Sequence, residues 1–149
     1  MPRPTPFPRR GLAPVLLTLA CALGTAALPL RAQTLPPAQQ YGQVSYVTGG
    51  FGQDESEAFK AAMGQYALAL TLSSRSDGRA AYIADVQVVL RDAQDATVLN
   101  VTAQGPFLLA RLEPGRYRLF ATYLGRTLSR ELTVRQGATT RIDLNWPDR

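Results

Sequence analysis

The sequence predicts an all-β protein, a seven-stranded antiparallel β-sandwich with one short helix near its N-terminus. Three observations lead to this prediction. Apolar and polar residues alternate with a period of two in successive runs, which is typical of strands with one buried face. Turn-forming residues separate these runs, and one stretch alone has a helical pattern. Short strands in series favour a sandwich over a parallel α/β sheet.

The first 32 residues are expected to be a signal peptide that is cleaved from the mature protein. Basic residues precede an apolar run from Leu12 to Leu28, and Ala27 or Ala32 is placed to precede a cleavage site. Prolines and a glycine interrupt the run, which does not suit a membrane anchor of about 20 apolar residues. We therefore expect a periplasmic or secreted protein without an integral membrane span.

Two other export routes stay open at this point. Cys21 follows Thr18-Leu19-Ala20, which resembles a lipoprotein box but lacks a leucine three residues before the cysteine. The Arg9-Arg10 pair resembles a twin-arginine signal in a poorly fitting context. Cys21 is the only cysteine, so its removal leaves a mature chain without disulfides or thiol chemistry.

The positive charge of the chain is concentrated in this leader. The full sequence carries a net charge of +5, but four of its 16 basic residues precede Gln33, whereas all 11 acidic residues follow it. From Gln33 onward, the sequence contains 12 basic and 11 acidic residues. Because nucleic-acid binding needs a basic patch on the folded domain, we expect no nucleic-acid partner.

The segment before the sandwich is predicted to hold a tether and the only helix. Residues 33–42 are polar and contain prolines, which predicts a disordered tether. Residues 43–65 are expected to form a short strand from Val44 to Val47, a glycine-rich loop and a helix from Glu55 to Met63. Asp54 with Glu57 fits a capping box at the start of this helix, and Gly64 is expected to end it.

Residues 66–146 carry the seven predicted strands of the sandwich. Turns are expected at Asp77-Gly78, Asp92 to Asp95, Leu124-Gly125 and Gln136-Gly137. The strand runs are Tyr66–Leu72, Ala84–Arg91, Thr97–Thr102, Pro106–Leu112, Arg116–Tyr123, Arg126–Arg135 and Thr139–Trp146. Arg130 shares the apolar parity of its run, which predicts an edge or end position for it. Between two strands, Pro114-Gly115 predicts a type II turn with a positive φ at the glycine.

One motif resembles a known family. Its residues are Gly105, Phe107, Leu109, Leu112, Pro114, Gly115 and Tyr117, followed by an alternating strand and a glycine turn. This pattern resembles the carboxypeptidase regulatory-like domain, a transthyretin-like β-sandwich that is found in many secreted bacterial proteins. The resemblance covers roughly Tyr66 to Trp146 and implies the fold, an accessory role and no peptidase activity. The family usually has glycine where Asp95 stands here, a residue that also tolerates a positive φ.

The residue types restrict the chemistry. The sequence contains no histidine, which removes serine–histidine and imidazole catalysis and the usual zinc sites. Asp54, Glu55 and Glu57 fit a helix start, where acids are favoured. Asp92 and Asp95 lie in a hairpin and are too few for a calcium site by themselves. We therefore expect no enzyme activity, catalytic residues, cofactor or metal, with a carboxylate-only hydrolase as a remote alternative.

Aromatic residues are the remaining candidates for a binding surface. Alternation places most of them in the core, while Phe120 lies on the polar side of its strand. The aromatics considered are Tyr41, Tyr46, Tyr66, Tyr82, Tyr117, Phe120, Tyr123 and Trp146. The main hypothesis is an exported, non-catalytic module that binds another envelope protein through an edge strand or a side-chain patch. The alternative is a carbohydrate or small-ligand binding module that uses exposed aromatics.

Overall fold

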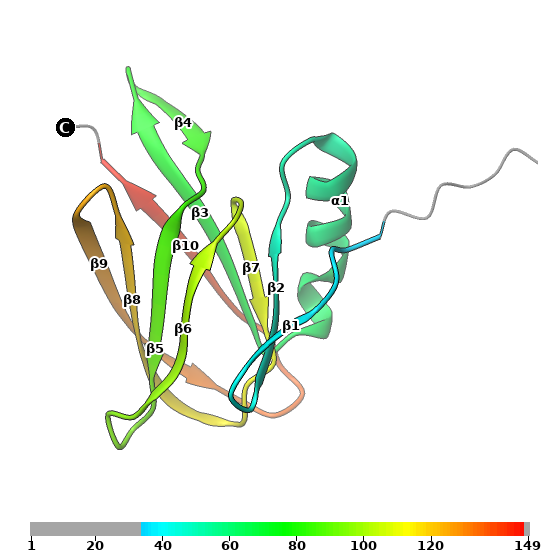
Figure 1. Ribbon diagram of the computed structural model, residues 1–149, viewed down its shortest axis with the longest axis vertical. Coiled ribbons are helices and arrows are strands. Elements are labelled where there is room, and N and C mark those ends of the chain that lie inside the picture. Colours follow the sequence, from blue (N-terminus) through cyan, green and yellow to red (C-terminus); the bar gives the residue numbers. More distant parts are fainter. Residues whose placement is uncertain (1–33, 148–149) are drawn as a thin grey trace, which may run out of the picture. The chain divides into compact units, whose positions relative to one another are not determined.

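The structure, a computed structural model, describes residues 34–147. Figure 1 shows two β-sheets face to face, with a helix on the outer side of one of them. The elements are β1 (Gln39–Tyr41), β2 (Val44–Gly49), α1 (Gln53–Ala62), the 3₁₀ turn η1 (Met63–Gln65), β3 (Leu68–Ser76), β4 (Arg79–Tyr82), β5 (Val86–Arg91), β6 (Thr97–Ala103), β7 (Phe107–Ala110), β8 (Gly115–Tyr123), β9 (Arg126–Val134) and β10 (Thr140–Trp146).

The predicted all-β sandwich is confirmed. One sheet, sheet A, has the strand order β1-β2-β7-β3-β10, and β4 pairs with the far end of β3. The other, sheet B, has the order β6-β5-β8-β9. Alternate residues of the strands meet between the sheets, and among them Leu70, Leu90, Leu119 and Leu144 are completely buried. The apolar face that the alternation predicted is therefore the interior of the sandwich.

The strand number was predicted wrongly, because residues 34–147 form ten strands rather than seven. β1 lies within the expected tether at residues 33–42, and the predicted strand at Val44 joins sheet A as β2. β4 was also missed. All four of its residues are exposed. A strand without a buried face shows no alternation of apolar and polar residues, so the sequence pattern did not predict it. The signal peptide expected over residues 1–32 and its Cys21 lie outside the described residues.

The sheets are not antiparallel throughout. β3 and β10 pair in parallel along seven residues, from Leu68 opposite Thr140 to Ser74 opposite Trp146. Parallel neighbours need a long connection between them, and here the chain builds β4 to β9 before it returns. No turn motif marks such a pair, so local sequence patterns did not predict it.

The helix begins earlier than expected, and its predicted cap is wrong. α1 starts at Gln53, and Gly52 precedes it with a φ of 89°, while the amide of Ser56 donates to the carbonyl oxygen of Gly52 at 3.0 Å. Glycine accepts this positive φ without strain, so the helix starts before Asp54 can cap it. Gly64 falls inside η1 rather than ending α1.

Helix α1 covers part of the outer face of sheet A. The predicted apolar stripe is present, because Phe59 and Ala62 are buried and Met63 is partly buried beside them. Phe59 packs with Val47, Ala69, Phe107 and Leu109 of the sheet in a second, smaller apolar cluster. Sheet A is therefore buried on both faces where the helix lies, and only there.

The turn at Pro114-Gly115 differs from the prediction. Gly115 does not have a positive φ and is already the first residue of β8. The corner is held instead by Tyr117, whose hydroxyl donates to the carbonyl oxygen of Glu113 at 2.7 Å. The other predicted turns are confirmed by positive φ values at Asp77, Gly78, Asp95, Leu124, Gly125 and Gly137.

Candidate functional site

At the two long sides of the sandwich, the edge strands of one sheet lie near those of the other without pairing with them in the described residues. β9, at one edge of sheet B, lies along β10, and β1, at one edge of sheet A, lies along β6. Arg130 is exposed on β9, an edge strand, in agreement with the edge or end position that the sequence predicted for it. β4 is also an edge strand, but among the described residues β3 is the only strand that lies along it. In Figure 1 the β3–β4 hairpin rises past the end of β7.

The backbone of β4 presents hydrogen-bonding groups away from β3. The amide of Ile83, directly after β4, donates to the carbonyl oxygen of Leu72 at 3.3 Å. Peptide groups alternate in direction along a strand, so Ala81 also faces β3 while Ala80 and Tyr82 face outward. Their two N–H and two C=O groups have no neighbouring strand in the described part of the chain. This row is the free edge of β4.

The free edge has few of the features that block strand pairing. Natural edge strands are often protected by proline, bulges or inward charges. β4 has the sequence Arg-Ala-Ala-Tyr, pairs with β3 without a register shift and contains two small side chains. Arg79, beside the turn, is its only charged residue. An extended segment can therefore approach Ala80 and Tyr82 closely.

A rigid group of aromatic rings lies next to this edge. Tyr82 is 49 % exposed, and its ring meets that of Phe107 edge to face at 5.4 Å. Phe107 in turn stacks on Phe59 of α1 at 5.7 Å. The ammonium group of Lys60 lies 6.0 Å from the centre of the Tyr82 ring. Tyr82 is therefore held in place by packing while half of its surface stays available.

Phe51 is a second exposed aromatic residue, in the loop that passes this cluster. It is 53 % exposed and follows Gly50, whose backbone lies so close to Phe107 that a Cβ atom there would collide with the ring. The backbone next to Phe51 and the ring of Tyr82 thus both lie against the buried Phe107. We call the free edge of β4 together with these two rings the β4 edge site. The signal for Phe51 was present in the sequence, since glycines flank it on both sides.

The predicted aromatic candidates divide into three groups. Tyr46, Tyr117 and Trp146 are buried, as the alternation predicted. Tyr82 is exposed, although the alternation gave no reason to single it out. Tyr41, Tyr66, Phe120 and Tyr123 are half-buried. The ring of Phe120 is covered by the Arg91 guanidinium at 5.6 Å, so it does not form an apolar patch by itself.

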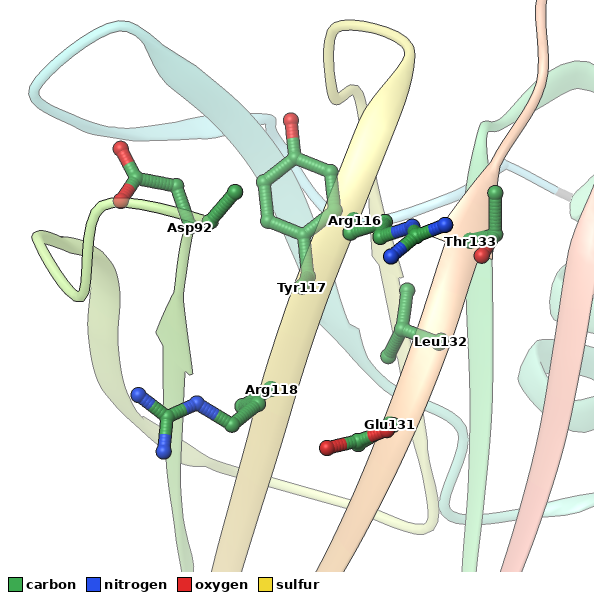
Figure 2. Close-up of a pocket in the computed structure, with 8 residues that line it drawn as sticks. Asp92, Arg116, Tyr117, Arg118, Glu131, Leu132 and Thr133 are labelled. Carbon is green, nitrogen blue, oxygen red and sulfur yellow. The ribbon is translucent and has the colours of Figure 1, made fainter.

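A polar depression of about 500 Å³ lies at β8 and β9 (Figure 2). Arg118 and Glu131 are opposite each other in the register of these strands and lie beside each other in Figure 2. The hydroxyl of Tyr117 points away from this pair, toward the carbonyl oxygen that it binds. Burial, and then the nearby charges of Glu113 and Asp92, raise the pKa of Tyr117 above 10.0.

The acidic residues of this region hold a turn. One carboxylate oxygen of Asp92 accepts the amides of Gln94 and Ala96, each at 2.9 Å. Asp95 has a φ of 65° and forms ion pairs with Arg91 and Arg118. The tolerance of Asp95 for this conformation was predicted. The Asp92 carboxylate thus holds the turn of the β5–β6 hairpin, and the Asp95 carboxylate joins this hairpin to β8. Both carboxylates have structural partners.

The other predicted acids lie at the start of α1. Asp54 and Glu55 occupy its first turn, and Glu57 accepts a hydrogen bond from the Gln53 side chain at 3.1 Å. Within residues 34–147, no three histidine, cysteine, aspartate or glutamate side chains gather as metal ligands would. These acids therefore support the helix, while the β4 edge site is where the described chain offers unsatisfied bonding groups and exposed rings together.

Comparison with protein-family models and with curated proteins found no match to the chain. The resemblance to the carboxypeptidase regulatory-like domain therefore stays a prediction. In the part of the chain that the structure describes, no helix has the length and hydropathy of a membrane span. In residues 34–147, fold and site together define a β-sandwich with an open strand edge at β4.

Proposed function

We propose that this chain is an exported, non-catalytic β-sandwich that binds another protein of the cell envelope at the β4 edge site. The observation that carries the proposal is the free edge of β4, where the peptide groups of Ala80 and Tyr82 face outward. Strand addition at such an edge supplies main-chain hydrogen bonds, and neighbouring side chains supply selectivity. The missing histidine and the structural engagement of Asp92 and Asp95 support a binding role over a catalytic one.

The partner is expected to contribute an extended segment. Two residues of β4 offer two donors and two acceptors, which suits a short strand of similar length. A side chain of that segment on the outer face of sheet A would lie beside Tyr82, with Phe51 nearby. Because the ring of Tyr82 is held by its packing against Phe107, we expect an apolar side chain at this position of the partner.

The test is capture of the partner with matched proline variants. Ala80→Pro removes an outward amide but no hydrogen bond to β3, so the hairpin should stay intact. Gln40→Pro is the control, because it removes the outward amide of β1, at the edge that lies along β6. Each variant is expressed in its native cells, crosslinked mildly and recovered from the envelope fraction.

The proposal expects a crosslinked protein with the natural chain and with Gln40→Pro, and a loss of at least tenfold with Ala80→Pro. Circular dichroism of the purified variants checks that all three remain folded. Failure to recover any partner with the natural chain, or equal recovery with both proline variants, would reject docking at β4.

Carbohydrate binding is the second candidate, and the exposed rings of Phe51 and Tyr82 favour it. Aromatic faces of this kind can stack on sugar rings. A glycan array with the natural chain, Phe51→Ala and Tyr82→Ala separates the two functions. Saturable glycan binding that both alanine variants lose would support this candidate, and the Ala80→Pro variant would then still bind. An array without any saturable signal would remove it.

A further inference from the structure

β9, the edge strand of sheet B, has a second row of outward peptide groups. In the described residues β8 is the only strand that pairs with it, and the pairing has no register shift. The turn Leu124-Gly125 has a positive φ at both residues, as in a type I′ hairpin, so Tyr123 and Arg126 form a hydrogen-bonded pair. Every second residue from Thr127 to Thr133 therefore directs its N–H and C=O groups away from β8. Figure 1 shows β9 at the margin of the sandwich.

The two ends of this edge are held by β10. The hydroxyl of Thr140 donates to the carbonyl oxygen of Thr133 at 3.0 Å, in agreement with the outward direction of that carbonyl group. At the other end of β9, the indole N–H of Trp146 donates to the carbonyl oxygen of Arg126 at 2.9 Å. Between these contacts, Ser129–Glu131 are all exposed. The middle of β9 is therefore the part of the edge that another strand can reach.

Arg130 lies at the centre of this exposed part. The register places it opposite the completely buried Leu119, on the face of the strand that carries the buried Leu132. Its side chain nevertheless leaves the core face, and its guanidinium donates to the carbonyl oxygen of Ser129 at 2.8 Å. Because Ser129 is one of the outward residues, this arginine covers an acceptor in the middle of the edge. A charge that starts on the inner face of an edge strand opposes pairing with a further strand.

A second copy of the chain fits this edge in every respect except Arg130. In an antiparallel pair of two β9 strands centred on Arg130, Ser129 of one copy lies opposite Glu131 of the other, and each such pair exchanges two hydrogen bonds. The charge of Glu131 is already opposite Arg118 within each copy. At the centre, however, the two Arg130 side chains would face each other, and like charges directly opposite destabilise a strand pair.

We propose that Arg130 determines which edge of the sandwich accepts a strand, because it prevents β9 from pairing with β9 of a second copy. Its charge repels the same residue of that copy, and its hydrogen bond covers the acceptor of Ser129. β4 has no comparable residue, since Ala81 stands between its two outward residues. The inference goes beyond docking at β4 and does not depend on it, because it concerns a different edge.

Self-association of an Arg130→Thr variant tests this proposal. Threonine removes the charge and the hydrogen bond and suits a strand. Sedimentation velocity over a series of protein concentrations should show self-association at least tenfold tighter than that of the natural chain. Arg130→Lys keeps the positive charge and should behave as the natural chain does. Arg141→Thr removes the same charge from an exposed position of β10 and should also leave self-association unchanged.

A proline variant locates the association at β9. Ser129→Pro, introduced into the Arg130→Thr chain, removes an outward amide in the middle of the edge and no hydrogen bond to β8. Self-association should then return to the level of the natural chain, while circular dichroism shows that the variants remain folded. Association of Arg130→Thr no tighter than that of the natural chain, equal association of Arg130→Lys and Arg130→Thr, or association that survives Ser129→Pro would each overturn the proposal.

Discussion

The two halves of sheet A differ in what covers their outer face. Beneath α1, Val47, Ala69 and Leu109 are nearly inaccessible, and Phe59 and Phe107 seal the layer. Beyond the end of β7 the same sheet continues as the β3–β4 hairpin, where all four residues of β4 are exposed. One half is closed by the protein's own helix, whereas nothing in the described chain covers the other.

The difference lies in the residues as well as in the cover. β3 changes along its length from Leu68–Leu72, which are mostly apolar, to the polar sequence from Ser73 to Ser76. The first part gains free energy by burial and therefore needs α1, while the second part is stable in contact with water. The covered half accounts for stability, and the open half is available for binding. The following variants test this division, beginning with the largest expected effect.

Phe107→Ala should destabilise the protein most. Phe107 is 1 % exposed and links Phe59 to Tyr82, so its loss leaves a cavity under the helix. We expect a decrease of about 3–5 kcal/mol in the free energy of unfolding, measured by urea denaturation. Tyr82→Ala, in the open half, is the control and should cost less than about 1 kcal/mol. Equal losses would mean that the two halves do not differ in this way.

Gly105→Ala should have the next largest effect. A Cβ atom at Gly105 would collide with the backbone of Gly49, where β2 leads toward the helix. Overpacking of this kind costs about 1–3 kcal/mol. Gly64→Ala is the matched control, because a Cβ atom there meets nothing within 4 Å. Thermal unfolding should show a lower midpoint for the first variant and an unchanged or higher one for the second.

Tyr117→Phe should have a smaller effect that depends on pH. The change removes the hydrogen bond to Glu113, which is worth about 1 kcal/mol. Since the pKa of Tyr117 is raised in the folded state, its contribution is complete below pH 10.0 and is lost as the pH rises through the folded pKa. Urea denaturation at pH 8 and above pH 10 measures this effect. Between these pH values, the free energy of unfolding should fall less for Tyr117→Phe than for the natural chain.

The sequence predicted the closed parts of the molecule better than the open one. Alternation placed Leu70, Leu90 and Leu144 in the core, and turn residues marked Asp77, Asp95 and Gly137 correctly. The turns depend on local sequence, and the core positions follow from the one buried face of each strand. Two of the wrong predictions, at Asp54 and Gly115, concern a helix cap and a corner, where a nearby glycine or tyrosine provides another solution.

The candidate site was hardly visible in the sequence. β4 has no buried face and therefore no period, and the free edge depends on β7 ending where β4 begins. The parallel pairing of β10 with β3, which leaves β4 on the other side, joins segments far apart in the chain. Only Phe51 between its glycines gave a local indication of an exposed ring. Edges and grooves arise from the assembled sheet, so periodicity does not predict them.

Amide hydrogen exchange in β4 tests the central claim most directly. In the free protein, the amides of Ala80 and Tyr82 should exchange rapidly, whereas those of Ala81 and Ile83 should be protected by β3. After addition of the captured envelope protein, Ala80 and Tyr82 should become protected, and the outward amide of Gln40 should not change. Slow exchange at Ala80 and Tyr82 in the free protein, or rapid exchange that persists in the complex, would contradict docking at the β4 edge site.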